Sequence, residues 1–239
     1  SMLTAYDYFT SKMEDEAGVD IILIGDSLGM VVLGYENTLS VTIEDTLRHT
    51  GAVVRGTKNA LVVADMPAGS FDDKKTAVLN AEALLKIGAD AVKIEKKPEI
   101  ARFLVENNIP VQGHVGLTPH TAKEFKVQGK DEATKQAIID EAIELDKAGC
   151  FSIVLECVPS SLAKEITKRV SCPTIGIGAG LNCDGQVLVC NDMLGLYDKF
   201  SPKFVKRYTD LGKSMKEAFE NYNKEVKERK FPEDKHSFH

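Results

Sequence analysis

The stretch DIILIGD at residues 20–26 is a short apolar run that ends in a carboxylate, and the same plan recurs in LVVAD at 61–65 and AVKIE at 91–95. Runs of this length, rich in β-branched residues, are typical of buried strands. They alternate with helical stretches along the chain, which is the pattern of βα units around a parallel sheet. Eight runs fit this description, at residues 3–7, 20–27, 60–66, 91–95, 110–116, 152–158, 173–180 and 186–192. The sequence therefore predicts an α/β fold, a closed (β/α)8 TIM-type barrel with extra C-terminal helices.

Length and composition agree with a single domain. The 239 residues match the roughly 250 that such a barrel usually needs. No low-complexity linker or shift in composition interrupts the chain, so we expect one barrel domain over 1–239, with a helical extension at 201–230 and a polar tail at 231–239. Helices are expected at 42–56, 72–87, 131–148 and 160–170, where apolar residues recur at helical spacing.

Charge and cysteine content exclude several classes of protein. A formal charge of −6 gives neither a basic face for nucleic acid nor a polybasic patch for a membrane surface. No apolar run reaches the roughly 18 residues of a membrane span. The five cysteines are odd in number and form no C-x-x-C pair, which argues against a disulfide framework or a zinc site. This cysteine usage predicts a cytoplasmic protein.

Polar residues follow the predicted strands at the end of the barrel where chemistry takes place. Asp26, Asp65 and Glu95 end three neighbouring strands, so we expect them to converge. Three close carboxylates repel one another unless a cation neutralises them, and oxygen ligands without His or Cys favour Mg²⁺ over Zn²⁺. The alternative is that each acid caps a helix or pairs with a basic residue. Other polar residues at strand ends are Asp7, His114, Glu156 and Asp192.

A lysine accompanies this predicted metal site. Lys93 lies two residues before Glu95, so alternation points both side chains into the barrel. The lysine needs an anionic partner, which is either the acidic cluster or a substrate carboxylate. Ser27 can offer a hydroxyl and a backbone N–H to the same anion.

Mg²⁺ beside an inward lysine suits a small 2-oxo acid, chelated through its keto oxygen and its carboxylate. Chelation acidifies the neighbouring carbon because it stabilises the enolate. Glu156, at the end of the sixth strand, is the candidate base, and His114 is either a hydrogen-bonding helper or a structural histidine. The long connection at 117–130 has the length of an active-site lid.

Motifs along the whole chain resemble one family. They run in order from the first strand to the last residue: TAYDY (4–8), GDSLGM (25–30), LVVADMP (61–67), VKIE (92–95), GHVGLTP (113–119), KVQGK (126–130), LECVP (155–159), IGIGAG (175–180) and HSFH (236–239). In these blocks the chain resembles the ketopantoate hydroxymethyltransferase (3-methyl-2-oxobutanoate hydroxymethyltransferase) family.

The resemblance implies a Mg²⁺-dependent barrel enzyme of pantothenate biosynthesis, the route to the coenzyme A precursor. Such enzymes transfer a hydroxymethyl group from 5,10-methylenetetrahydrofolate to 3-methyl-2-oxobutanoate, giving 2-dehydropantoate. Residue by residue, the motifs imply metal binding by Asp26, Asp65 and Glu95, oxo-acid contacts from Asp26, Ser27, Asp65 and Lys93, and proton abstraction by Glu156. The family also implies a cytoplasmic homo-oligomer, often a decamer.

The chain departs from the family pattern in places, and two other functions compete with it. Lys96 and Lys97 stand where the family commonly has two glycines, and the loops at 96–98 and 119–126 are shorter than the family's. The first alternative is a Mg²⁺-dependent 2-oxo-acid lyase or phosphonomutase-type barrel, which would not depend on folate. The second is a non-catalytic binding or assembly subunit, in which the acids pair with lysines.

Overall fold

A computed structural model describes residues 1–119, 126–200 and 202–239. The chain forms two compact units, Ser1–Val189 and Cys190–His239. The first unit contains every strand of the sheet, and the second contains the C-terminal helices. The single domain expected over 1–239 stays a prediction.

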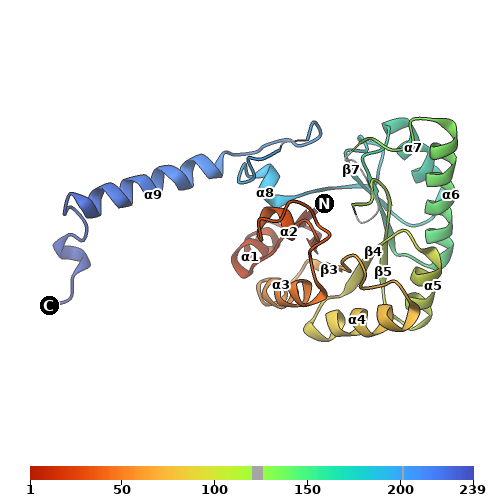
Figure 1. Cartoon of the computed structure of the whole chain (residues 1–239), viewed down its shortest axis with the longest axis horizontal. Helices are drawn as coiled ribbons and strands as arrows, with labels where there is room; N and C mark the ends of the chain where they lie inside the picture. The colour runs from red at the N-terminus through yellow and green to blue at the C-terminus, as the bar shows by residue number, and fades with distance from the viewer. Residues whose placement is uncertain (120–125, 201) are drawn as a thin grey trace. The chain divides into compact units, whose positions relative to one another are not determined.

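The first unit is a closed barrel of eight parallel strands in sequence order, which confirms the predicted fold (Figure 1). The strands are β1 (Met2–Thr4), β2 (Ile21–Ile24), β3 (Leu61–Asp65), β4 (Ala91–Glu95), β5 (Val111–Gly116), β6 (Ser152–Glu156), β7 (Thr174–Ile177) and β8 (Gly185–Leu188). Several predicted strands were too long at their carboxyl ends. After β7, for example, Gly178 and Gly180 adopt positive φ values of 62° and 78°, which turn the chain away from the sheet.

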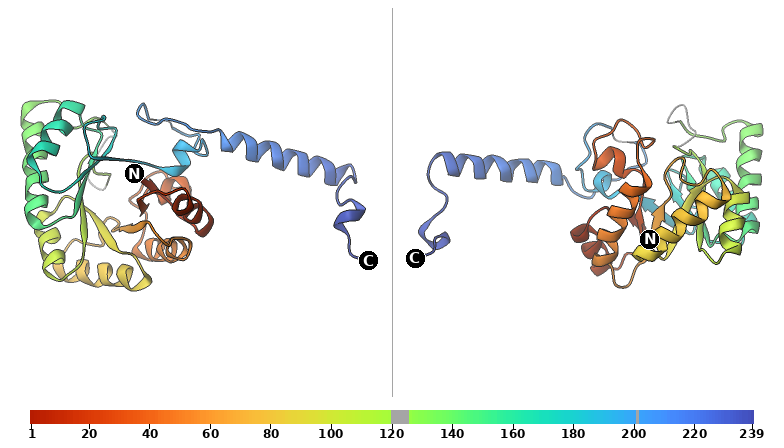
Figure 2. Two further views of the ribbon diagram at one scale, coloured as in Figure 1. Left: turned by 180° about the vertical axis from the view of Figure 1, so that it is seen from behind. Right: turned by 60° about the horizontal axis from the view of Figure 1, so that its bottom comes forward.

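Helices lie on the outside of this barrel (Figures 1 and 2). They are α1 (Tyr8–Glu16), α2 (Leu28–Val31), α3 (Ile43–Gly56), α4 (Lys74–Ile87), α5 (Pro98–Glu106), α6 (Glu132–Ala148) and α7 (Ser160–Arg169). The four predicted helices match α3, α4, α6 and α7 within two residues, because clear cap signals bound most of them. Thr42 forms a capping box with Asp45, and Gly88 and Gly149 end α4 and α6 in the left-handed conformation.

Apolar side chains fill two separate regions of the barrel unit. A large cluster packs between the sheet and the helices, and a smaller one, which includes Leu23, Val63 and Val154, fills the barrel interior. Farther along the strands the interior becomes polar. Asp65 lies two residues after Val63 in β3, and Glu156 lies two residues after Val154 in β6, so each acid is on the same inward face as the valine. The carboxyl ends of the strands are therefore where buried polar groups collect.

The second unit contains α8 (Cys190–Met193), α9 (Leu211–Lys227) and a short 3₁₀ turn, η1 (Asp234–His236). The helix expected within 201–230 is thus present as α9. The eighth strand ends at Leu188, so its predicted extension to residue 192 is wrong, and Asp192 belongs to α8. No helix among the described residues is long and apolar enough to cross a membrane. The predicted lid at 117–130 includes residues 120–125, which lie outside the described residues.

Candidate active site

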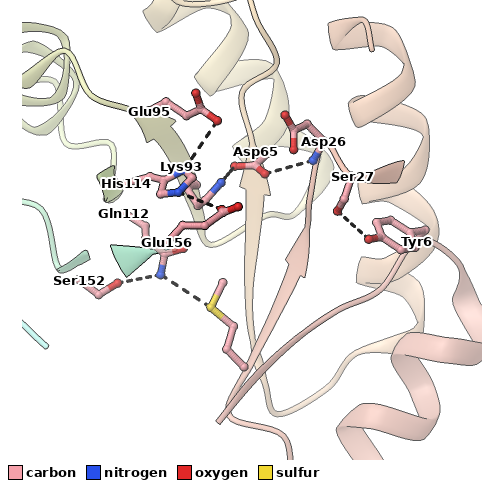
Figure 3. A network of polar contacts seen from close by, with 11 residues as sticks. Tyr6, Asp26, Ser27, Asp65, Lys93, Glu95, Gln112, His114, Ser152 and Glu156 are labelled. Atoms are coloured by element: carbon pink, nitrogen blue, oxygen red, sulfur yellow. Dashed lines mark hydrogen bonds and ion pairs between the residues drawn. The ribbon is translucent and has the colours of Figure 1, made fainter. Parts of the chain in front are cut away.

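Six polar side chains from five neighbouring strands or their ends meet at the carboxyl end of the barrel (Figure 3). They are Asp26, Asp65, Lys93, Glu95, His114 and Glu156. The first five are buried, with 2–8% of each residue exposed, whereas the side chain of Glu156 is 20% exposed. The structure therefore gathers in one place the residues that the sequence suggested for metal binding and proton abstraction.

Lys93 forms a buried ion pair with Asp65. The two residues are register partners on β4 and β3, and the ammonium donates to Oδ1 of the carboxylate. The other oxygen, Oδ2, accepts a hydrogen bond of 3.1 Å from the backbone N–H of Asp26. Burial raises the pKa of Asp65, against the effect of Lys93. Burial would favour a neutral Lys93, but the carboxylates of Asp65, Asp26 and Glu95 raise its pKa overall, so the lysine stays charged.

His114 lies between two carboxylates. Its Nδ1 is 3.7 Å from Oε1 of Glu95, and its Nε2 is 3.2 Å from Oε2 of Glu156. Neither contact has hydrogen-bond geometry, so both ring nitrogens are buried without a hydrogen-bond partner among the described residues. Burial, followed by the charge of Lys93, lowers the pKa of His114 to about 4, so the ring is neutral near pH 7. A neutral imidazole has one donor and one acceptor to offer to a ligand or a water molecule.

Glu156 has the pKa of a group that exchanges protons near neutral pH. Burial raises its pKa to about 8, and the charge of Asp26 adds to this effect while Lys93 opposes it. Burial is the main cause, because Lys93 lowers the pKa of Glu156 by more than Asp26 raises it. Any cation that entered this end of the barrel would favour the ionised form of Glu156.

The type of donor atom and the formal charges of the acids decide whether a metal ion fits. Among the described residues, no three His, Cys, Asp or Glu side chains form a ready-made metal site. Asp26, Asp65 and Glu95 nevertheless supply only hard oxygen donors, and against Lys93 they leave two negative charges. A divalent cation that prefers oxygen ligands would suit this donor set. The residues present therefore fit Mg²⁺ in chemistry and in charge.

Ser27 is held by a residue that the sequence analysis did not assign. The hydroxyl of Tyr6 and Oγ of Ser27 are 2.8 Å apart, and Tyr6 is only 3% exposed. The backbone carbonyl of Tyr6 is in turn 2.6 Å from Nδ1 of His49. The signal for this role was present in the sequence, because Tyr6 follows the first strand within the TAYDY motif.

A buried polar pair, Gln112 and Ser152, lies beside the charged group, and the sequence analysis did not assign it. The amide of Gln112 donates a 2.8 Å hydrogen bond to Oγ of Ser152, and its Nε2 is 4.0 Å from Sδ of Met2 (Figure 3). Gln112 is the register partner of Lys93 and is fully buried. A glutamine within an otherwise apolar run of strand residues was the sequence signal that could have indicated this buried polar residue.

Two acids that the sequence analysis placed at strand ends have other positions. Asp7 is exposed and caps α1, where its carboxylate accepts hydrogen bonds from the backbone N–H groups of Phe9 and Thr10 at 2.9 and 3.0 Å. Asp192 belongs to the second unit. The helix-capping alternative therefore holds for Asp7, whereas Asp26, Asp65 and Glu95 gather at the barrel end.

Comparison with known proteins identifies the family. The family model described as ketopantoate hydroxymethyltransferase matches residues 1–234. The chain belongs to the ketopantoate hydroxymethyltransferase family. It is 54% identical over 246 residues to the 3-methyl-2-oxobutanoate hydroxymethyltransferase of Carboxydothermus hydrogenoformans, covering 100% of this chain and 89% of that protein. The relative of the same name from Clostridium botulinum (strain Langeland) is also 54% identical, with 100% and 90% of the two chains covered.

Solved structures with little sequence identity share the fold. The phosphoenolpyruvate phosphomutase from Streptomyces platensis subsp. rosaceus superposes with a TM-score of 0.64 over 95% of this chain and 82% of its own, at 11% identity. This likeness shows a common barrel architecture. Membership of the ketopantoate hydroxymethyltransferase family makes the chain an enzyme, a hydroxymethyltransferase, which sets aside the non-catalytic alternative.

Proposed function

We propose that this chain transfers a hydroxymethyl group from 5,10-methylenetetrahydrofolate to 3-methyl-2-oxobutanoate, giving 2-dehydropantoate for pantothenate biosynthesis. The observation that carries the proposal is the position of Glu156 beside Lys93 and three further acids, in a chain of this family. A barrel end with one buried ammonium, one carboxyl that exchanges protons near neutral pH and hard oxygen donors suits enolisation of a 2-oxo acid.

Each residue has a role in this proposal. Lys93 and Ser27 steady the substrate carboxylate, and Tyr6 keeps the hydroxyl of Ser27 in place. Glu156 accepts the proton from C3 of the oxo acid. His114, whose Nε2 is 3.2 Å from Oε2 of Glu156, would form a hydrogen bond with that carboxyl after a small reorientation as it gains and loses its proton.

Asp26, Asp65 and Glu95 would hold Mg²⁺. When bound, the ion would stabilise the negative charge that develops on the keto oxygen as the C3 proton leaves, an effect worth several kcal/mol. It would also offset the two negative charges that Lys93 leaves unbalanced, which favours the ionised form of Glu156 as a base.

The overall reaction balances with water as a third reactant. The C3–H bond breaks, C3 bonds to the methylene carbon of the folate, and the bonds from that carbon to nitrogen break. Water supplies the hydroxyl group, and tetrahydrofolate leaves with its nitrogens protonated. Glu156 is the one carboxyl that this scheme requires to gain and lose a proton.

The test separates enolisation from the transfer. In D₂O with Mg²⁺, we expect the chain to exchange the C3 proton of 3-methyl-2-oxobutanoate for deuterium. ¹H NMR measures the rate of this exchange, first without tetrahydrofolate and then with it. Glu156→Gln should slow this exchange by roughly 10²-fold or more, the usual contribution of a positioned base. It should leave binding of the oxo acid within a few-fold.

The matched control is Glu165→Gln, a glutamate on the outside of the barrel in α7 that pairs with Lys135. It should exchange like the unmodified chain. Full turnover with 5,10-methylenetetrahydrofolate then tests the one-carbon donor. Exchange that continues undiminished in Glu156→Gln would show that another group removes the proton.

A further inference from the structure

The connection after β4 has a strained backbone directly beside the candidate metal-binding acids. Lys96 and Lys97, the two residues that follow Glu95, both adopt left-handed conformations, with φ values of 55° and 50°. Residues with a β-carbon pay free energy for this conformation, and two in succession persist only where the surroundings hold them. Helix α5 then begins at Pro98.

The side chain of Lys97 ties this strained turn to the neighbouring connection, which runs from β3 to α4. Its Nζ is 2.7 Å from Oδ1 of Asp72 and lies 5.0 Å from the centroid of the Phe71 ring. Phe71 is only 4% exposed and packs in the large apolar cluster, so it is a fixed anchor. The cation–π contact with Phe71 and the ion pair with Asp72 both hold the ammonium of Lys97 in this place.

Lys96 has the same strained backbone but a different environment. Its backbone N–H donates a 3.0 Å hydrogen bond to the carbonyl of His114, which extends the pairing of β4 with β5. The charge of Lys96 acts instead on Glu141, a partly buried residue of α6. Lys96 and Lys97 are therefore suitable neighbours to compare, because they carry the same formal charge and both have a positive φ.

We propose that Lys97 is a positioning residue, which holds the ends of β3 and β4 together so that Asp65 and Glu95 face one divalent cation. Asp65 ends β3 and Glu95 ends β4, and Lys97 joins the two connections that begin directly after them. The inference rests on the proposed metal-binding role of these acids. Lys97 itself is not assigned any contact with the substrate.

Charge and position predict opposite effects of removing this lysine. A positive charge near a cation site weakens binding, so its loss alone would tighten the binding of a cation. Loss of a residue that holds the two ligand-bearing connections together weakens binding, but by less than loss of a group bonded directly to a ligand, because Lys97 pairs with Asp72 and Phe71. The direction of the change therefore separates positioning from simple electrostatics.

The experiment measures Mn²⁺ binding to the full chain by titration calorimetry, without substrate. Lys97→Met should raise the Kd for Mn²⁺ by up to about fivefold, the size expected from loss of a partly exposed ion pair. Lys97→Arg, which can keep both contacts, should stay within about twofold of the unmodified chain. Lys96→Met is the matched control and should bind Mn²⁺ as tightly as the unmodified chain or more tightly.

Other outcomes would contradict the proposal. Binding by Lys97→Met that equals or exceeds that of the unmodified chain would overturn the positioning role while leaving the metal site intact. A chain that binds no Mn²⁺ before any substitution would overturn both the positioning role and the proposed metal site. If Lys97→Met does not fold, Phe71→Leu removes the aromatic face without a change in charge, and it should weaken Mn²⁺ binding several-fold.

Discussion

Asp65 and Lys93 have side chains that are only 6% and 7% exposed, so neither charge has ready access to water. A buried ion pair contributes little net stability, but removing one partner leaves the other charge uncompensated. We therefore expect Lys93→Met to lower the free energy of unfolding by about 3 kcal/mol. The double variant Asp65→Asn with Lys93→Met should recover much of that loss, because no charge is left alone. Urea unfolding of both variants measures the difference.

The double variant also separates stability from activity. It should be well folded and yet fail to exchange the C3 proton of the oxo acid, since it lacks both the ammonium and one carboxylate of the candidate site. A single Lys93→Met variant as stable as the double variant would mean that Asp65 reaches water or gains a proton at little cost. That result would contradict the prediction that an unpaired Asp65 carboxylate destabilises the fold.

At the residue scale, the sequence predicted which side chains gather but not how they pair. The alternation of residues in a strand gives the inward face of Lys93, and the order of strands gives its neighbours. Whether the ammonium pairs with Asp65 or Glu95 depends on register, which the sequence left open and the structure fixes by pairing Asp65 with Lys93. Tyr6 was missed because its contact with Ser27 crosses from the first connection to the second.

Aspartates at the amino ends of the strands accept hydrogen bonds from the backbone. Near the start of β7, the carboxylate of Asp146 accepts hydrogen bonds from the backbone N–H groups of Ser171 and Cys172, both at 3.0 Å, and from Oγ of Ser171 at 2.8 Å. Asp90 similarly accepts from the N–H of Val62 at 2.8 Å. Acids at the amino ends of the strands thus bind backbone donors, whereas Asp65, Glu95 and Glu156 at the carboxyl ends lie beside the side chains of Lys93 and His114.

Asp146→Asn should therefore affect stability alone. Losing hydrogen bonds to a charged acceptor should cost about 1 to 2 kcal/mol of unfolding free energy at pH 7. Burial would raise the pKa of Asp146, but its hydrogen bonds with Ser171 and Cys172 lower it overall. The stabilisation is then complete above the pKa of the unfolded chain, about 4, and is lost as pH falls below that value.

Urea unfolding across this pH range checks the prediction. The gap between Asp146→Asn and the unmodified chain should be constant from about pH 8 to pH 5 and shrink only below about pH 4. Deuterium exchange of the oxo acid should be unchanged, because Asp146 lies on α6 away from the candidate site. A loss of exchange activity in Asp146→Asn without a loss of stability would contradict the prediction that this acid contributes to stability alone.

At the element scale, the sequence predicted the starts of strands and helices better than the ends of strands. Helix boundaries were clear because Thr42 and Asp131 cap them and Gly88 and Gly149 end them. The predicted strands ran on into residues such as Asp192, because apolar content alone does not show where ladder pairing stops. The gathering of Asp26, Asp65 and Glu95 at the carboxyl ends of neighbouring strands could be predicted only because the strand order was right.

At the scale of the whole molecule, α9 presents an apolar stripe that its own unit does not bury. Met215, Phe219, Tyr222 and Val226 are 41%, 64%, 59% and 42% exposed, and no residue of α9 is buried. Their spacing of four, three and four residues places them on one side of the helix. Exposed stripes of this kind usually mark an interaction surface. We expect this stripe to pack either against a second copy, in the homo-oligomer that the family resemblance implies, or against other residues of its own chain.

Phe219→Ser separates these two possibilities. If α9 packs against a second copy, the substitution should lower the molar mass in sedimentation or light-scattering experiments at micromolar protein, because the most exposed aromatic of the stripe is lost. If α9 packs within its own chain, the mass should stay constant while the thermal unfolding midpoint falls. Asn221→Ser, on the opposite side of the same helix, is the control and should change neither quantity. Unchanged mass and unchanged unfolding in Phe219→Ser would mean that the stripe packs against nothing in the purified protein.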